Sequence, residues 1–290
     1  MRRERRRRKA SRFSHVSIRS RVNAGDAVNP QPPMQETATA VDTHCHLFLM
    51  DAKPEDAVES ARAAGVGRLV CVGIDPRSSH ASVELAEQFE GVVFATAGMH
   101  PHEASDLGSE ARADIEALVA NPLVAGIGET GLDFFRMHAP REDQEAALRF
   151  HAALSRETGK PLVVHVRDAW ERALEMLDEE HMDQVVLHCF SGDEPIAAEC
   201  IRRGYFLSFA GPITYPKNES LRAAARVIPA DRILTETDSP YLPPQKLRGQ
   251  SNVPANVHAV VDCLAETRGE SPDEVVRTTF ENAKIVFAGL

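Results

Sequence analysis

Short apolar runs recur along this 290-residue chain, with room for one helix between successive runs. Eight runs are rich in Val, Ile, Leu and Ala, which is typical of strands buried on both faces. They span 40–46, 68–74, 92–98, 124–129, 161–166, 184–189, 205–210 and 233–237. Segments with helical spacing follow them, at 54–65, 78–89, 109–120, 140–158, 169–179, 195–203, 220–228, 254–267 and 272–287. This alternation predicts an α/β fold, a (β/α)8 TIM barrel.

Length and composition agree with one such domain over residues 38–290. A hydrophobic content of 43% supports a large core, and no apolar run approaches the roughly 18 residues of a membrane span. The five cysteines are scattered without CxxC pairing, which predicts reduced thiols in a cytoplasmic protein. The alternative fold, an open doubly wound sheet, would be favoured by a glycine-rich phosphate loop after the first strand. The sequence has none there.

The net charge of −10 conceals two opposite regions. Residues 1–22 carry ten Lys and Arg against one Glu, so the remainder of the chain carries a net charge of −19. Residues 23–36 are polar and turn-rich, and we expect 1–37 to form a disordered basic extension. Three interpretations stay open for it: a start codon assigned upstream of Met34, a nucleic-acid-binding arm, or a transit peptide. No apolar segment follows the arginines, so a secretory signal is not expected.

Histidines and carboxylates gather where the predicted strands end. The first strand ends in His44, Cys45 and His46, and side chains alternate across a strand. Both imidazoles are therefore expected on the inner face of the barrel, where they can reach one metal ion. By the same alternation we expect Asp42 on that face and Cys45 in the helical layer outside.

Four further ligand candidates stand at the ends of other strands: Glu129, His165, His188 and Asp238. A single histidine in an apolar strand is usually a satisfied core residue, but two at matching depth on consecutive strands favour a shared site. Six candidates exceed the roughly three or four protein ligands of one tetrahedral ion, so we expect two divalent ions that share Glu129. Nitrogen and oxygen ligands suit Zn²⁺, Mn²⁺, Co²⁺ or Ni²⁺, whereas Mg²⁺ is a poorer partner for imidazole. Asp238 and Glu129 are the expected catalytic carboxylates, and Asp238 can also accept a proton from water.

Other polar residues near the strand ends allow two interpretations each. His100 and His102 follow the third strand. They either contact substrate phosphate or support the ligands, or they merely cap a helix or face solvent. Glu236 either orients a ligand or forms a structural salt bridge. Three residues have simpler expectations: Arg167 can reach a phosphate, Asp133 can stabilise a turn, and Cys189 should point away from His188.

With these motifs in order, the chain resembles the TatD-related deoxyribonucleases, a branch of the amidohydrolase-like metal-dependent hydrolases. The matching motifs are 42–47 (DTHCHL), 98–102 (GMHPH), 128–133 (GETGLD), 165–169 (HVRDA), 188–192 (HCFSG), 236–242 (ETDSPYL), 248–249 (RG), 252–254 (NVP) and 279–283 (TFENA). They cover essentially the whole predicted barrel, and their combination is highly specific.

The resemblance implies metal-dependent hydrolysis of phosphodiesters. It implies one metal ion on His44, His46, Glu129 and Asp238, and a second on Glu129, His165 and His188. Many amidohydrolases bridge their ions with a carboxylated lysine. Here Glu129 occupies the matching position, and Lys160 is expected at the opposite end of the barrel. This difference favours the nuclease branch over lactonases and phosphotriesterases.

The leading hypothesis is therefore a deoxyribonuclease, expected to be a monomer with DNA as its substrate. The alternative is a hydrolase of small phosphate esters, amides or lactones, and a third reading is a non-enzymatic binding protein with structural metals. The charge of −19 opposes the nuclease hypothesis, because DNA-binding surfaces are usually basic. A local cationic patch in the predicted rim loops could offset it, made of Arg136, Arg167, Lys217, Lys246 and Arg248.

Overall fold

The computed structural model describes residues 38–287 and 289–290. Within them, eight parallel strands form one sheet in the order of the sequence. The strands are β1 (Ala40–Cys45), β2 (Val66–Val72), β3 (Val93–Ala97), β4 (Val124–Asp133), β5 (Leu162–Arg167), β6 (Val185–Leu187), β7 (Phe206–Phe209) and β8 (Ile233–Thr235). A bridge between Cys45 and Ser239 joins the last strand region to the first. The predicted (β/α)8 barrel is confirmed, whereas the predicted basic extension of residues 1–37 lies outside the described residues.

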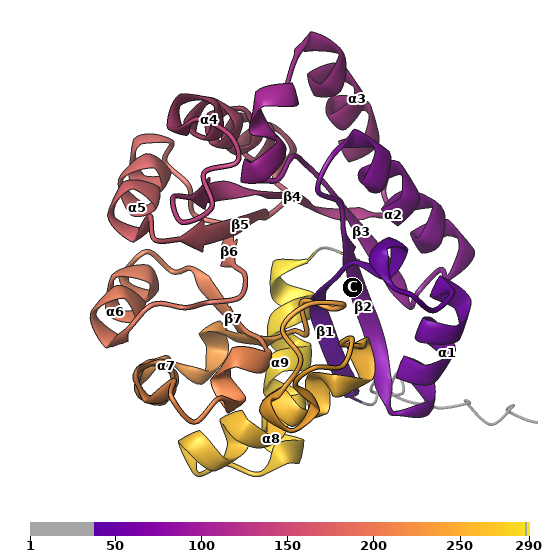
Figure 1. Ribbon diagram of the computed structural model, residues 1–290, viewed down its shortest axis with the longest axis vertical. Helices are drawn as coiled ribbons and strands as arrows, with labels where there is room; N and C mark the ends of the chain where they lie inside the picture. Colours follow the sequence, from indigo (N-terminus) through magenta and orange to yellow (C-terminus); the bar gives the residue numbers. More distant parts are fainter. Residues whose placement is uncertain (1–37, 288) are drawn as a thin grey trace, which may run out of the picture. The chain divides into compact units, whose positions relative to one another are not determined.

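Helices surround this barrel (Figure 1). They are α1 (Pro54–Ala63), α2 (Pro76–Gln88), α3 (Ser109–Val119), α4 (Arg141–Thr158), α5 (Trp170–Glu179), α6 (Glu194–Arg202), α7 (Glu219–Val227), α8 (Val257–Arg268) and α9 (Pro272–Val286). Local signals explain where they begin. Asp75 and Ser271 form capping boxes at α2 and α9, and each of these helices has proline in its first turn. None of the helices in the described part of the chain is long and apolar enough to cross a bilayer.

Two clusters of buried apolar side chains stabilise the barrel. The inner cluster takes side chains from all eight strands, mostly from their first residues, and so fills the amino-terminal half of the interior. Helix α9 covers that end with Phe280, and Phe287 and Leu290 add to the cover just beyond the helix. The outer cluster lies between the strands and the surrounding helices. This packing leaves the carboxyl ends of the strands free to carry polar groups.

The prediction that Asp42 shares a face with His44 and His46 is wrong. Strand β1 shifts its register against β2 between Asp42 and Cys45, which interrupts the alternation just before the two histidines. The Asp42 carboxylate turns to Thr237 and accepts hydrogen bonds from its amide at 2.8 Å and its hydroxyl at 2.5 Å. Cys45 belongs to the outer cluster, as predicted.

Candidate metal centre

The six ligand candidates meet at the carboxyl-terminal end of the barrel, although some lie beyond the strands as observed. His44, Glu129 and His165 lie within β1, β4 and β5. His188 and Asp238 follow β6 and β8, which end at Leu187 and Thr235 and are shorter than predicted. Beyond β8 the backbone stays attached to β1, because the amide of Asp238 donates to the carbonyl of His44 at 2.9 Å.

One group of donors surrounds the Oε2 oxygen of Glu129. This oxygen lies 3.3 Å from Nε2 of His44 and 3.9 Å from Nε2 of His46. The two Nε2 atoms are 3.3 Å apart, and Oδ1 of Asp238 lies 3.5 Å from Nε2 of His46. We call His44, His46, Glu129 and Asp238 the first donor set.

A second group surrounds the other oxygen of the same carboxylate. Oε1 of Glu129 lies 2.8 Å from Nε2 of His188 and 3.1 Å from Nδ1 of His165. The two imidazole nitrogens are 3.2 Å apart. We call Glu129, His165 and His188 the second donor set. The two oxygens of one carboxylate therefore face different pairs of imidazoles.

His100 also approaches Oε1 of Glu129, at 3.4 Å, but its hydrogen bonds give it a different character. Its Nδ1 accepts the backbone N–H of His102, as the cap of the short helix Pro101–Asp106. Burial lowers the pKa of His100 to about 3, so the ring is neutral at pH 7 and its proton is on Nε2. His100 thus presents a hydrogen-bond donor, not a lone pair. It caps a helix, as one interpretation predicted, and it also faces the centre.

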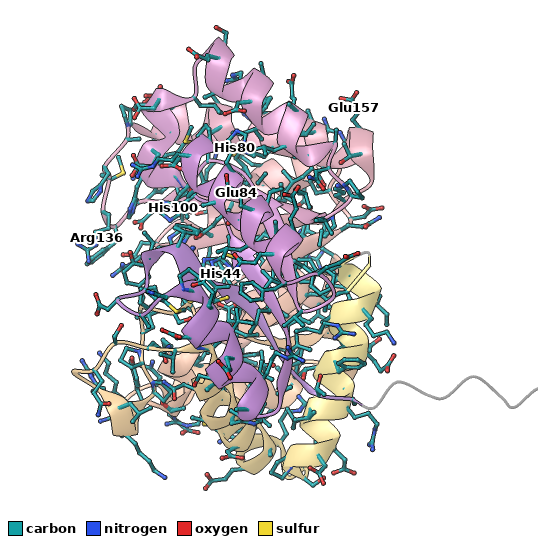
Figure 2. All side chains as sticks on the ribbon, turned by 90° about the vertical axis from the view of Figure 1, so that its right-hand side faces the viewer. His44, His80, Glu84, His100, Arg136 and Glu157 are labelled. Carbon is teal, nitrogen blue, oxygen red and sulfur yellow. The ribbon has the colours of Figure 1, made fainter. Side chains whose placement is uncertain are left out.

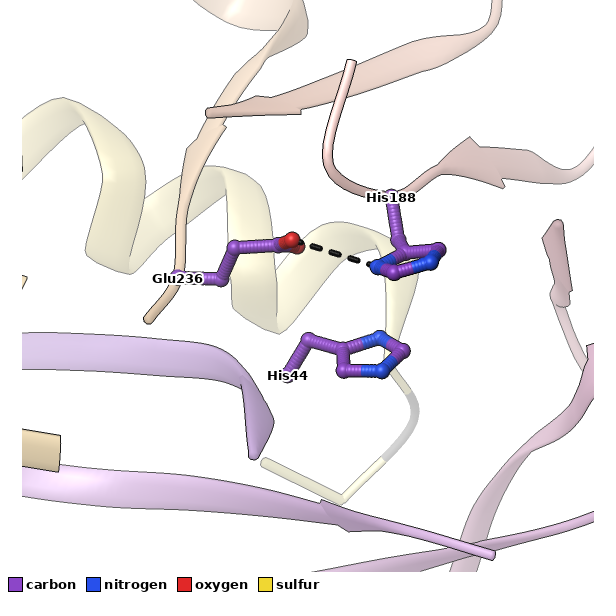
Figure 3. A group of neighbouring side chains, drawn as sticks. All are labelled: His44, His188 and Glu236. Atoms are coloured by element: carbon purple, nitrogen blue, oxygen red, sulfur yellow. Dashed lines mark hydrogen bonds and ion pairs between the residues drawn. The ribbon is translucent and has the colours of Figure 1, made fainter. Parts of the chain in front are cut away.

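Buried carboxylates support the imidazoles from behind. Oε1 of Glu236 lies 3.2 Å from Nδ1 of His188 (Figure 3). The same oxygen accepts the amide of Cys189 at 2.8 Å. The ring of His188 in turn stacks on that of His44, with centroids 3.8 Å apart. A carboxylate on the far nitrogen fixes which nitrogen of the ring faces the centre. His46 is fixed in the same way by the carbonyl of Val72, at 2.8 Å from its Nδ1.

Asp133 supports two further histidines, a role that the sequence did not indicate. It accepts the amides of Phe135 and Arg136, which confirms the predicted turn. Its Oδ2 also lies 2.9 Å from Nε2 of His102 and 3.4 Å from Nε2 of His165. Because β4 runs on to Asp133, further than predicted, this carboxylate remains inside the barrel rim.

The backbone beside these groups needs unusual conformations. Gly128 and Gly131 have φ of 131° and 138°, and a Cβ on either would meet a carbonyl oxygen of β5 at 2.4 or 2.0 Å. Only glycine allows β4 to approach β5 so closely at Glu129. Asp238 has φ of 55°, in the left-handed region that non-glycine residues rarely occupy.

The pKa values of Glu129 and its neighbouring histidines are set by burial and by the opposite charges of the two kinds of group. Burial raises the pKa of Glu129, but His188, His100 and His44 outweigh it and hold the pKa well below its usual range. Burial lowers the pKa of His188, yet Glu129 and Glu236 raise it well above the ordinary value. In His44, burial and the nearby His188 lower the pKa by more than Glu129 and Glu236 raise it.

Loops beyond the strands enclose a cavity of about 640 Å³ over the two donor sets. Its lining includes His100, His102, Arg136, His138, Arg167 and Tyr241. Figure 2 shows Arg136 at the end of the barrel opposite to α9. The expected cationic patch is only partly present here, because Lys217, Lys246 and Arg248 do not line the cavity.

Cys189 lines the cavity too, so the prediction that it points away is wrong. The chain has already left β6 at this residue, and Cys189 has φ of 44°, so strand alternation no longer applies. Lys160 does lie at the opposite end of the barrel, as predicted. Its Nζ donates to the carbonyl of Val124, the first residue of β4, at 2.6 Å.

Comparisons with known proteins identify the family of this chain. The family model described as TatD related DNase matches residues 41–288. YabD of Bacillus subtilis, named an uncharacterized metal-dependent hydrolase, is 36% identical over 250 residues, covering 85% of this chain and 98% of YabD. A Cronobacter sakazakii protein named 3'-5' ssDNA/RNA exonuclease TatD is 37% identical over 244 residues, covering 82% of this chain and 92% of that protein. The crystal structure of YJJV, a TatD homolog from Escherichia coli K12, has a TM-score of 0.82 at 26% identity, covering 87% of this chain and 99% of YJJV. The chain therefore belongs to the family of TatD-related DNases.

Proposed function

We propose that this chain, a metal-dependent hydrolase of the TatD-related family, cleaves phosphodiester bonds of single-stranded nucleic acid, DNA above all, with two divalent ions. The observation that carries the proposal is the position of Glu129, whose two oxygens face two separate imidazole pairs. A carboxylate so placed could supply one oxygen to each of two ions, which would activate water and polarise a phosphodiester. The relative named as an exonuclease of ssDNA and RNA supports the substrate class.

The donor atoms fit divalent cations. Nδ1 of His188 donates to Glu236, and the raised pKa of this ring keeps a second proton on Nε2, which faces Glu129 at 2.8 Å. A divalent ion bound there would take the place of that proton. Ligands at about 2.1 Å from a tetrahedral ion lie about 3.4 Å apart. The contacts within the two donor sets range from 2.8 to 4.0 Å.

The number of buried carboxylates also favours two divalent ions. The centre and its supports contain four carboxylates, whose side chains are at most 13% exposed: Glu129, Asp133, Glu236 and Asp238. Anions buried without compensation are strongly unfavourable. Two divalent cations would supply four positive charges against these four negative ones.

We assign one ion to the first donor set and one to the second. Bound there, divalent ions lower the pKa of water and neutralise charge that develops on phosphate. Burial raises the pKa of Asp238, but the hydrogen bond from His46 and the charges of nearby imidazoles outweigh this effect. The pKa is therefore below its ordinary value, and Asp238 is ionised at neutral pH. Its carboxylate can therefore also accept a proton beside the scissile bond.

Donors for the phosphate oxygens line the same cavity. Nε2–H of His100 and the guanidinium groups of Arg136 and Arg167 are suited to this role, because charge-assisted hydrogen bonds to phosphate are strong. His102 shares a hydrogen bond with Asp133 and would help to keep this carboxylate in place beside His165 of the second donor set. Glu236 would orient His188 as a ligand.

The test is a time course on a 5'-labelled single-stranded oligonucleotide with Mn²⁺, beside nitrophenyl esters as small substrates. We expect stepwise shortening of the oligonucleotide that stops with a chelator and with Asp238→Asn. Asp114→Asn, which removes a half-exposed carboxylate paired with His80, is the matched control. Intact DNA beside rapid ester cleavage would instead assign the site to small phosphate esters, amides or lactones.

A further inference from the structure

Exposed apolar side chains concentrate at the carboxyl-terminal end of the barrel, where Leu49 and Tyr241 line the cavity and Phe135 lies beyond its lining, against Arg167. Six large hydrophobic side chains are exposed in the described part of the chain. Four of them lie in loops that follow β1, β4 and β8 at this end of the barrel: Leu49, Phe135, Met137 and Tyr241. Exposed apolar surface gathered around a cavity is typical of a contact surface for a ligand.

Two of these side chains are aromatic and lie over different donor sets. Tyr241, 53% exposed, lines the cavity, and its ring lies edge-on to that of His46 with centroids 6.1 Å apart. Phe135, 57% exposed, carries the guanidinium of Arg167 over its ring at 4.0 Å. Arg167 ends the strand that holds His165. Tyr241 therefore lies beside the first donor set, and Phe135 lies on the side of the second.

Hydrogen bonds fix the backbone of both aromatic residues to the centre. The amide of Phe135 donates to Asp133 at 3.0 Å, and the same carboxylate supports His165. The amide of Tyr241 donates to the carbonyl of Asp238 at 2.8 Å, and its carbonyl accepts from Asn252 at 2.9 Å. Exposed rings on an anchored backbone are preorganised for binding, because little freedom is lost when a ligand packs on them.

We propose that Phe135 and Tyr241 stack the two nucleobases that flank the scissile phosphate, one on each side of the metal centre. This inference rests on the proposed nuclease function. Every base has a π face, so such stacking tolerates any sequence, and it requires unpaired bases, which a single-stranded end provides. A cavity of about 640 Å³ has room for a ligand of nucleotide size.

Stacking also answers the objection from charge. From residue 23 onward the chain carries a net charge of −19, which repels a polyanion. Contacts with bases depend little on that charge, and positive groups are placed locally. Arg167 and Arg136 lie 4.0 and 6.0 Å from the ring centre of Phe135, where a neighbouring phosphate would pass. Affinity would thus come from bases and from a few local cations.

The experiment compares two single-stranded oligonucleotides, one complete and one with abasic residues at the two terminal 3' positions, with Mn²⁺. For the wild type we expect faster cleavage of the complete substrate. Phe135→Ala and Tyr241→Ala should each lower kcat/KM on the complete substrate roughly tenfold or more, the size of one base–aromatic stack. On the abasic substrate they should change it less than about twofold, because no base is there to stack.

Val227→Ala and Ile285→Ala are the matched controls, because these exposed side chains lie in the last turns of α7 and α9 and do not line the cavity. Phe135→Trp and Tyr241→Phe keep a π face and should keep the preference for bases. Phe135→Leu and Tyr241→Leu keep the apolar volume but have no π face, so they should lose the preference for the complete substrate. These variants test the inference even if an alanine variant fails to fold.

The outcomes separate the two proposals. If the wild type cleaves neither oligonucleotide, the nuclease function fails and the stacking inference fails with it. If the wild type cleaves both at equal rates, or the variants lose both activities equally, the nuclease function stands and base stacking by Phe135 and Tyr241 is overturned.

Discussion

The carboxylate of Asp42 accepts hydrogen bonds from both the amide and the hydroxyl of Thr237, the residue immediately before Asp238. The Thr237 hydroxyl also accepts the amide of Ser239 at 3.1 Å, so the chain is held on both sides of Asp238. Asp238 needs this support because its backbone has φ of 55°. Asp42 thus positions Asp238 although it does not face the metal centre.

Replacing Asp42 by alanine should therefore damage both stability and activity. Asp42→Ala leaves the buried amide of Thr237 without its acceptor, whereas the Thr237 hydroxyl can still donate to Oγ of Ser239 at 2.9 Å. The free energy of unfolding should therefore fall by about 2 kcal/mol. The backbone at Asp238 should also relax, so kcat should fall at least tenfold. Urea unfolding in chelator and turnover with saturating Mn²⁺ measure the two effects. Ser208→Ala, which loses a buried bond to Thr43 in the barrel interior, should affect stability alone.

Glu129 should control both ions and Asp238 only one. Glu129→Ala removes a donor from each set, so we expect elemental analysis to find reduced occupancy at both positions. Asp238→Ala removes a donor from the first set only, and about one ion per chain should remain, because the second set keeps its donors. Two ions per chain in Glu129→Ala would contradict the bridging role.

Glu236 should set the affinity of the second ion through His188. Glu236→Ala removes the acceptor for Nδ1 of His188, and loss of such a support typically lowers metal affinity about 10- to 100-fold. Glu236→Gln should cost less, because its amide oxygen can still accept from the ring. Calorimetric titration of the metal-free protein with Zn²⁺ measures both steps. The affinity of the first ion is the internal control, and equal losses at both ions would show general disruption.

The barrel could be predicted because its strands are buried on both faces. A strand of this kind is apolar at most positions, so its sequence stands out without any tertiary information. The ligand candidates could be predicted for a related reason. The carboxyl ends of parallel strands meet at one rim, so polar residues that end different strands, such as His165 and His188, are neighbours in space.

The misplaced residues depend on local backbone geometry, which alternation does not encode. A register shift turned Asp42 toward Thr237, and a left-handed residue turned Cys189 into the cavity. Asp133 was expected only in a turn, because the extension of β4 to that residue has no apolar pattern to mark it. His138 lies in a loop without periodicity, and no sequence signal places it against His102, where their ring centroids are 4.3 Å apart.

A buried histidine outside the centre should make the fold sensitive to acid. His151 on α4 is fully buried; its Nδ1 donates to the carbonyl of Ala147 at 2.7 Å, and its Nε2 accepts the amide of Met99 at 3.1 Å. Both nitrogens are thus used by the neutral ring. Burial lowers the pKa of His151 from 6.5 to about 4.

Between these two pKa values the unfolded chain binds a proton at His151 that the folded chain does not. The free energy of unfolding therefore falls as pH drops through this window, and this residue should account for about 3 kcal/mol of the loss. Urea unfolding in chelator from pH 7 to pH 4.5 should show a steeper loss for the wild type than for His151→Gln, which cannot titrate. The difference between the two curves isolates His151, because every other titrating group is common to both proteins. Parallel curves would show that His151 is protonated in the folded state, and that its bond from Met99 does not form as described.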